Sequence, residues 1–233
     1  ASDVYKRQKV PWSGSGKGLN WCLHGFTKPV SNWCERVLRE QGGLTAEPIY
    51  NKVKDFALEF YSDGQGEVRF AGYSVFSTNE HGAYTGNLLA SDGQIEESIA
   101  CCLSLEKLTG IREALRAELA SIYGNTYTGY LGVDMMVCRS DKENGYRVHP
   151  CVEINMRMNM GVVARLFYDR FVAPGSKGCF AVEYVPDNET LRARHEQDMH
   201  DYPLTVEQGR LASGYLPLVP VTGKSCYRAY VRI

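Results

Sequence analysis

GVDMMV, residues 132–137, and VEINMRM, residues 152–158, decide the fold predicted for this chain. Both are rich in β-branched and apolar residues, and the polar stretch SDKENG, residues 140–145, lies between them. Two such runs on either side of a polar stretch predict a β-hairpin. We expect its strands at Tyr130–Arg139 and Tyr146–Met158.

Polar residues in this hairpin predict a cation site. Because side chains alternate along a strand, Glu153, Asn155 and Arg157 are expected on one face, and Asp134 can lie opposite them on the partner strand. Magnesium prefers oxygen ligands, usually one or two carboxylates with phosphates and water. Asp134, Glu153 and Asn155 are therefore candidate magnesium ligands. Arg157 is suited to a phosphoryl or carboxylate oxygen on which negative charge builds during group transfer. The alternative is a salt bridge between an acid and Arg157 on an exposed sheet face.

A glycine-rich stretch near the N-terminus predicts a second part of the site. PWSGSGKGL, residues 11–19, lets backbone N–H groups approach an anion, and Lys17 adds positive charge. It is not a Walker loop, because Pro11 and Gly18 stand where that motif needs Gly and Ser or Thr. The alternative is a plain flexible loop. The candidate phosphate-covering residues are Ser13, Gly14, Ser15, Gly16, Lys17 and Gly18.

The order of these features resembles the ATP-grasp superfamily. A lysine precedes the glycine loop, an acid ends a later strand, and GVD is followed by VEINMRM after nineteen residues (153 − 134). The resemblance covers Lys9 to about Leu166. It implies that Lys9 reaches ATP beside the adenine and phosphates and that Glu47 lies at the adenine and ribose edge. Asp55 falls near the position of the second acid that contacts the ribose in this superfamily. The resemblance also implies that Asp134, Glu153 and Asn155 bind Mg²⁺ and that Arg157 lies near the transferred phosphate.

The resemblance also implies a fold and an activity. The fold is α+β, with two α+β subdomains whose antiparallel sheets enclose a nucleotide cleft. The activity is phosphoryl transfer from ATP to a small-molecule carboxylate, giving an acyl phosphate that an amine or similar nucleophile displaces. The alternative is a degenerate module that binds nucleotide or a partner protein without catalysis. The first lysine and the N-terminal domain of the superfamily are absent here, which predicts an N-terminally truncated chain.

We expect three segments along the chain. Residues 1–8 include DVYKRQ, which resembles a translated sequencing adapter, and form a non-native tail; the alternative is a genuine, unstructured N-terminus. Residues 9–90 form a glycine-loop lid subdomain, and residues 91–233 form a metal-binding subdomain with a C-terminal extension that caps the domain or extends its sheet.

Apolar spacing and turn residues predict the other elements. One helix is expected over Val30–Glu40, with Ser31 or Asn32 as its N-cap. Another helical stretch, Ile95–Tyr123, is expected to break near Thr109-Gly110. The remaining helices are predicted at Gly161–Phe171 and Glu189–Met199, and the remaining strands at Leu44–Tyr50, Val53–Tyr61, Val68–Thr78, Cys179–Val185, Leu204–Val221 and Cys226–Ile233.

Composition indicates an ordinary globular protein. The 26 Lys and Arg nearly balance the 27 Asp and Glu, which gives no general attraction to nucleic acid or to an anionic membrane. No apolar run reaches the roughly 20 residues that span a bilayer, and no leader pattern begins the chain, so a cytoplasmic location is expected. The 8 cysteines lack zinc spacing and are expected to be buried free thiols, as in the segments around Cys138 and Cys151. The oligomeric state stays open.

Overall fold

The computed structural model describes residues 6–9, 18–22, 25–79, 83–140 and 145–233. By their contacts, residues 1–51 and 78–84 form a smaller unit, and residues 52–77 and 85–233 form a larger one. The predicted lid subdomain, residues 9–90, thus contributes to both units, because its later strands pair in the same sheet as the predicted metal hairpin. The functional division at residue 90 stays a prediction.

The smaller unit contains a three-stranded antiparallel sheet in the order β2-β1-β3. Its strands are β1 (Lys6–Lys9), β2 (Leu19–Cys22) and β3 (Thr45–Pro48). Part of the segment set apart as a tail, Lys6 to Gln8, is therefore paired in β1 on both sides.

Helix α1 (Lys28–Gln41) also belongs to the smaller unit. Its N-cap is Thr27, not Ser31 or Asn32, because Pro29 lies in the first turn, where a missing backbone N–H costs no hydrogen bond. The helix ends as predicted before Gly42, whose φ of 75° is the left-handed conformation that glycine adopts at helix C-termini.

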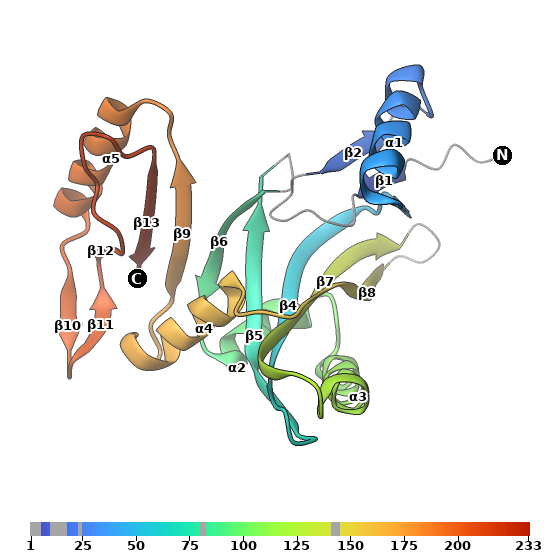
Figure 1. Cartoon of the computed structure of the whole chain (residues 1–233). Helices are drawn as coiled ribbons and strands as arrows, with labels where there is room; N and C mark the ends of the chain where they lie inside the picture. Colours follow the sequence, from blue (N-terminus) through green and yellow to red (C-terminus); the bar gives the residue numbers. More distant parts are fainter. Residues whose placement is uncertain (1–5, 10–17, 23–24, 80–82, 141–144) are drawn as a thin grey trace. The chain divides into compact units, whose positions relative to one another are not determined.

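The larger unit is built on an eight-stranded sheet (Figure 1). The strand pairs whose register is known are all antiparallel. Strands β9, β13 and β12 extend the sheet, as expected for the C-terminal part of the chain, and β6 had no sequence prediction. In sheet order the strands are β12 (Tyr215–Pro217), β13 (Tyr227–Arg232), β9 (Gly178–Tyr184), β6 (Tyr84–Leu89), β5 (Val68–Thr78), β4 (Lys52–Asp63), β7 (Thr128–Ser140) and β8 (Gly145–Asn155).

Four helices and a separate hairpin complete this unit. The predicted interruption of the long helical stretch falls before Leu105, where Ser104 begins a new helix by accepting a hydrogen bond from the backbone N–H of Lys107. The expected break at Thr109-Gly110 is wrong, since both residues lie inside that helix. The elements are α2 (Asp92–Ala100), α3 (Leu105–Tyr123), α4 (Met160–Phe171), α5 (Asn188–Asp201), β10 (Thr205–Glu207) and β11 (Arg210–Ser213). No helix in the described ranges is long and apolar enough to cross a membrane.

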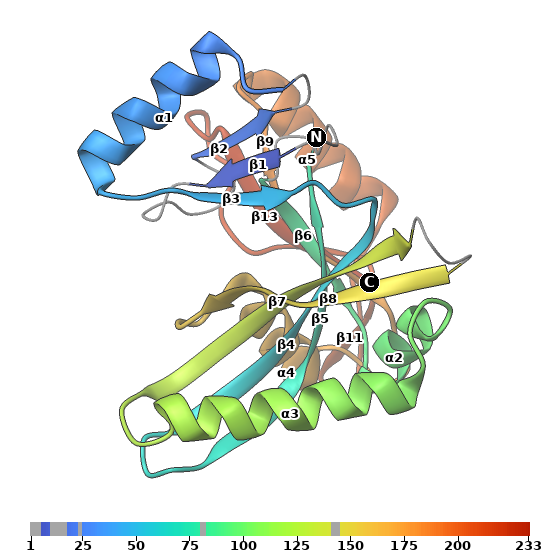
Figure 2. The ribbon, with the colours of Figure 1, turned by 90° about the vertical axis from the view of Figure 1, so that its right-hand side faces the viewer.

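The main core lies between one face of the sheet and α2 and α3. Figure 2 shows α3 running along the sheet beside β4, β5 and β7. Leu58 and Phe60 of β4 and Leu131 and Val133 of β7 are fully buried there, together with Leu108 of α3. Each such side chain contributes about 1.5–3 kcal/mol through burial. Because strand residues alternate, their neighbours Glu59, Gly132 and Asp134 belong to the opposite face.

Gly110 and Gly209 give a matched test of this description. An added Cβ meets nothing within 4 Å at either position, but Gly110 is helical and Gly209 has a φ of +79° in the turn between β10 and β11. We expect Gly110→Ala to raise the free energy of unfolding by about 1 kcal/mol, because alanine is the better helix former. Gly209→Ala should lower it by about 1 kcal/mol, because alanine is strained at positive φ. Urea unfolding of both variants measures the difference, and equal effects would contradict it.

Candidate functional site

The hairpin of β7 and β8 brings three of the predicted site residues together. The register places Asp134 directly opposite Glu153, and Gly132 opposite Asn155. All lie on the sheet face that points away from α3, since Val133 between them is buried against the α3 side. The predicted placement of two carboxylates and an amide on one sheet face is therefore present.

Asn155 links an acid to an arginine. Its Nδ2 donates to Asp134 Oδ2 at 3.0 Å, and its Oδ1 accepts from Arg157 Nη2 at 3.0 Å. Strand β8 ends at Asn155, not at Met158 as predicted, and the Arg157 N–H donates to the Asn155 carbonyl oxygen at 2.9 Å. Arg157 thus joins the group through a turn rather than through strand alternation.

An irregularity in the hairpin lies beside the acids. The register shifts between Asp134 and Met136, where β8 carries Pro150, which has no N–H to donate. Cys151 follows in this irregular segment and is exposed, so the prediction that it is buried is wrong. All eight cysteines are free thiols, as predicted, but Cys101 is exposed as well. The buried cysteines are Cys22, Cys34 and Cys138, and the partly buried ones are Cys102, Cys179 and Cys226.

Sequence reasoning missed a buried acid on the same face. Glu59 of β4 lies opposite Gly132 and is only 1% exposed. Its Oε2 accepts a 2.9 Å hydrogen bond from Asn159 Nδ2, and within the described part of the chain its Oε1 has no hydrogen-bond partner. The available signal was a single carboxylate in the apolar run FALEFY, residues 56–61.

The surroundings of Glu59 change its protonation. The pKa of Glu59 is raised from 4.5 to about 8, and burial is the largest cause. The hydrogen bond from Asn159 lowers this pKa, the charge of Asp134 raises it, and the charge of Arg157 lowers it. A Cβ at Gly132 or at Gly161 would collide with the Glu59 carboxyl, so two glycines make the space that this group fills.

The other predicted site residues lie in both units. In the smaller unit, Lys9 is paired with Thr45, and Glu47 is paired with Arg7. Gly18 lies in a turn with a φ of 75°, and the remaining loop residues, Ser13, Gly14, Ser15, Gly16 and Lys17, lie outside the described residues.

Asp55 lies in the larger unit. It is on β4 opposite Met136 and forms an ion pair with Lys52. The register of β4 and β7 places Asp55 on the same sheet face as Asp134.

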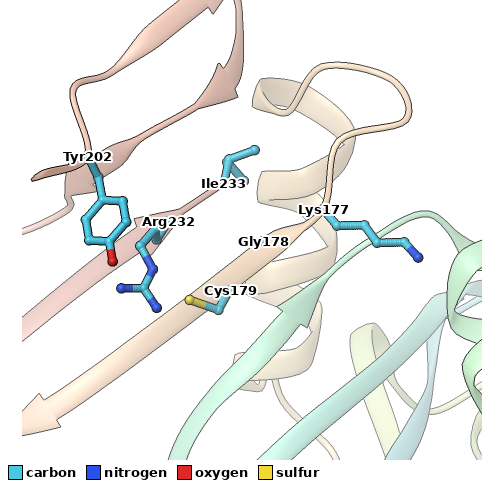
Figure 3. Close-up of a pocket in the computed structure, with 6 residues that line it drawn as sticks. All are labelled: Lys177, Gly178, Cys179, Tyr202, Arg232 and Ile233. Atoms are coloured by element: carbon cyan, nitrogen blue, oxygen red, sulfur yellow. The ribbon is translucent and has the colours of Figure 1, made fainter.

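A hollow of about 330 Å³ lies elsewhere in the larger unit, beside β9 and β13 (Figure 3). The Arg232 guanidinium lies 4.8 Å from the centre of the Tyr202 ring, whereas Lys177 extends away from it. The two cations do not converge, so this hollow is not arranged to hold a phosphate. It is lined by Lys177, Gly178, Cys179, Tyr202, Arg232 and Ile233.

The chemistry of the hairpin group fits a hard cation. Asp134 and Glu153 offer carboxylate oxygens from paired strands, whereas Asn155 turns its amide nitrogen toward Asp134 and its amide oxygen toward Arg157. No group of three or more His, Cys, Asp or Glu side chains in the described ranges could hold a metal. Two carboxylates alone suit magnesium, which completes its shell with phosphate and water oxygens.

Glu59 predicts a pH dependence of stability. Its pKa is raised, so between about pH 5 and about pH 8 the folded protein holds a proton that the unfolded chain has lost. The free energy of unfolding should therefore fall with rising pH, by up to about 1.4 kcal/mol per pH unit from this group. Glu59→Gln cannot titrate and should remove that slope. Urea unfolding of both proteins across this pH range measures the slope. Parallel plots of the free energy of unfolding against pH would contradict the conclusion that Glu59 is buried and protonated.

Comparison with known proteins identifies the fold. No family model and no curated protein sequence matches this chain. Solved structures do match. N5-carboxyaminoimidazole synthetase from Staphylococcus aureus, complexed with ADP, aligns over 99% of this chain and 57% of its own, with 11% identity and a TM-score of 0.56.

Two further structures agree. The biotin carboxylase domain of the Hydrogenobacter thermophilus 2-oxoglutarate carboxylase, in complex with MgADP, ADP and bicarbonate, aligns over 98% of this chain and 53% of its own, with 12% identity and a TM-score of 0.52. Carboxyaminoimidazole ribonucleotide synthase from Aspergillus clavatus, complexed with ATP, aligns over 98% of this chain and 57% of its own, with 12% identity and a TM-score of 0.53. This chain therefore spans little more than half the length of these structures, and it has the ATP-grasp fold.

Proposed function

We propose that this chain binds ATP with Mg²⁺ and that the whole protein uses it to phosphorylate a carboxylate substrate. The observation that supports this most is the cross-strand group on β7 and β8, where Asp134 opposes Glu153 and Asn155 bonds to Asp134. This group occurs on a fold shared with structures solved with ADP, ATP and MgADP. Mg²⁺, when bound, would neutralise negative charge on the phosphates of ATP.

The residues of the hairpin suit the two tasks of phosphoryl transfer, which are positioning and charge stabilisation. Asp134 and Glu153 would hold the cation from fixed strands, and the amide oxygen of Asn155, which accepts from Arg157 in this structure, would join them after the amide turns over. Arg157, held at Asn155, would stabilise negative charge on the transferred group. Lys9, residues 13–18, Glu47 and Asp55 are proposed to contact the nucleotide, as the family resemblance implies.

The proposed reaction has two steps. A substrate carboxylate oxygen forms a bond to the γ-phosphorus as the bond to the leaving ADP breaks, which gives an acyl phosphate. An amine or similar nucleophile then attacks the acyl carbon and releases inorganic phosphate. Both steps belong to the whole protein, because this chain spans only part of the length of its structural neighbours.

Glu153→Gln tests the metal assignment. We expect it to weaken ATP binding in the presence of Mg²⁺ by at least about tenfold, since one carboxylate ligand is lost, and to leave magnesium-free binding unchanged. The melting temperature should stay nearly constant because Glu153 is only half-buried on an edge strand. Calorimetric titration with and without Mg²⁺ measures the first effect, and thermal unfolding measures the second.

Glu67→Gln is the matched control, since Glu67 lies beside Arg69 on the exposed surface and outside the site. A large loss of stability in Glu153→Gln would favour the alternative of a structural salt bridge. Nucleotide binding that survives Asp134→Ala with Glu153→Ala would favour a non-catalytic nucleotide-binding module.

A further inference from the structure

A buried acid–amide pair connects the central sheet to the start of α4. Glu59 lies on β4 and Asn159 is its partner 100 residues later, and both are buried. Asn159 also caps α4, because its Oδ1 accepts a hydrogen bond of 2.9 Å from the backbone N–H of Val162. One side chain therefore fixes the helix start with its oxygen and bonds to the sheet with its nitrogen.

We propose that Glu59 and Asn159 are positioning residues that set the place of Arg157 in the proposed phosphate site. Arg157 lies in the short segment between Asn155 and Asn159. The first end of this segment is held by the bond from Asn155 to Asp134, and the second by the bond from Asn159 to Glu59. With both ends fixed, the turn between them has few conformations left. This inference deepens the proposed function and rests on it.

The choice of residues supports a role beyond capping. Serine would cap α4 as well as asparagine does, but it has no amide donor for Glu59. Keeping a carboxyl group at 1% exposure, with Oε1 unpartnered among the described residues, costs free energy that an apolar side chain would not. Gly132 and Gly161 leave the space for that carboxyl. The fold thus keeps a carboxyl group whose burial costs free energy at one end of the segment that carries Arg157.

Four variants of the full chain separate this role from general stability. Glu59→Leu removes the acceptor at similar volume, and Glu59→Gln keeps an acceptor for the amide of Asn159. Asn159→Ser keeps a capping oxygen and removes the amide donor. Ser104→Ala removes the N-cap of α3 and serves as the control for loss of a cap outside the site.

The first measurement needs no nucleotide. Hydrogen exchange of residues 155–162 should quicken in Glu59→Leu and Asn159→Ser and stay near the wild-type rate in Glu59→Gln. Ser104→Ala should quicken exchange only near the start of α3. Unchanged exchange of residues 155–162 in both Glu59→Leu and Asn159→Ser would overturn the inference, whatever the chain binds.

The second measurement uses ADP and the non-hydrolysable ATP analogue AMP-PNP, each with Mg²⁺. Because Arg157 is assigned to the transferred phosphate, which ADP lacks, Glu59→Leu should weaken binding of the analogue roughly tenfold and binding of ADP much less. Arg157→Gln should do the same. The double variant Glu59→Leu with Arg157→Gln should bind the analogue no more weakly than Arg157→Gln alone, because both changes remove the same contribution, which is the contact of Arg157 with the phosphate.

The outcomes distinguish the two proposals. If the wild-type chain binds both nucleotides and Glu59→Leu weakens them equally, or if the losses in the double variant add, the positioning role is overturned and the proposed function stands. If the wild-type chain binds neither nucleotide, the proposed function is overturned, and the positioning of Arg157 for phosphate falls with it.

Discussion

The alternation of side chains along β4 and β7 is the constraint on which the rest of the structure depends. Leu58 and Phe60 on β4, and Leu131 and Val133 on β7, pack against α2 and α3 and are fully buried. Their burial fixes which residues face the other way. A slip of one residue in either strand would place apolar side chains at the site and carboxylates in the main core, at a cost of several kcal/mol for each group. Stability on one face of the sheet therefore determines the chemistry on the other.

Part of that second face is polar although it is buried. Glu59 and Asn159 are bonded to each other there, and Asn87 donates to the Ser74 hydroxyl at 2.6 Å. All four side chains are buried. Buried polar groups cost free energy unless their hydrogen bonds are made, and in return they favour one arrangement over others. The apolar contacts with α2 and α3 supply the stability that allows such a layer to exist under α4.

Sequence patterns could predict the local parts of this arrangement, because strand alternation and turn residues act over short distances. The hairpin, the same-face placement of Asp134, Glu153 and Asn155, and the bounds of β5 follow from such patterns. The order of the motifs also indicated the ATP-grasp fold, which the structural comparisons confirm. The break in the long helical stretch was misplaced because Gly110 weakens a helix only modestly, whereas Ser104 offers a cap that starts a new one.

The role of Glu59 could not be predicted in the same way, because its partner lies 100 residues away and its space is created by two glycines on other elements. Strand alternation was expected to place Arg157 beside Asn155, but the strand ends at Asn155, and the contact between the two side chains is made through a turn. Beyond that residue a turn and a helix cap determine where the guanidinium lies. The proposed metal ligands thus depend on the regular geometry of the sheet, whereas the arginine depends on tertiary contacts of α4. A substitution under α4 can therefore move the arginine while the carboxylates stay in place, which makes the two halves of the site separable.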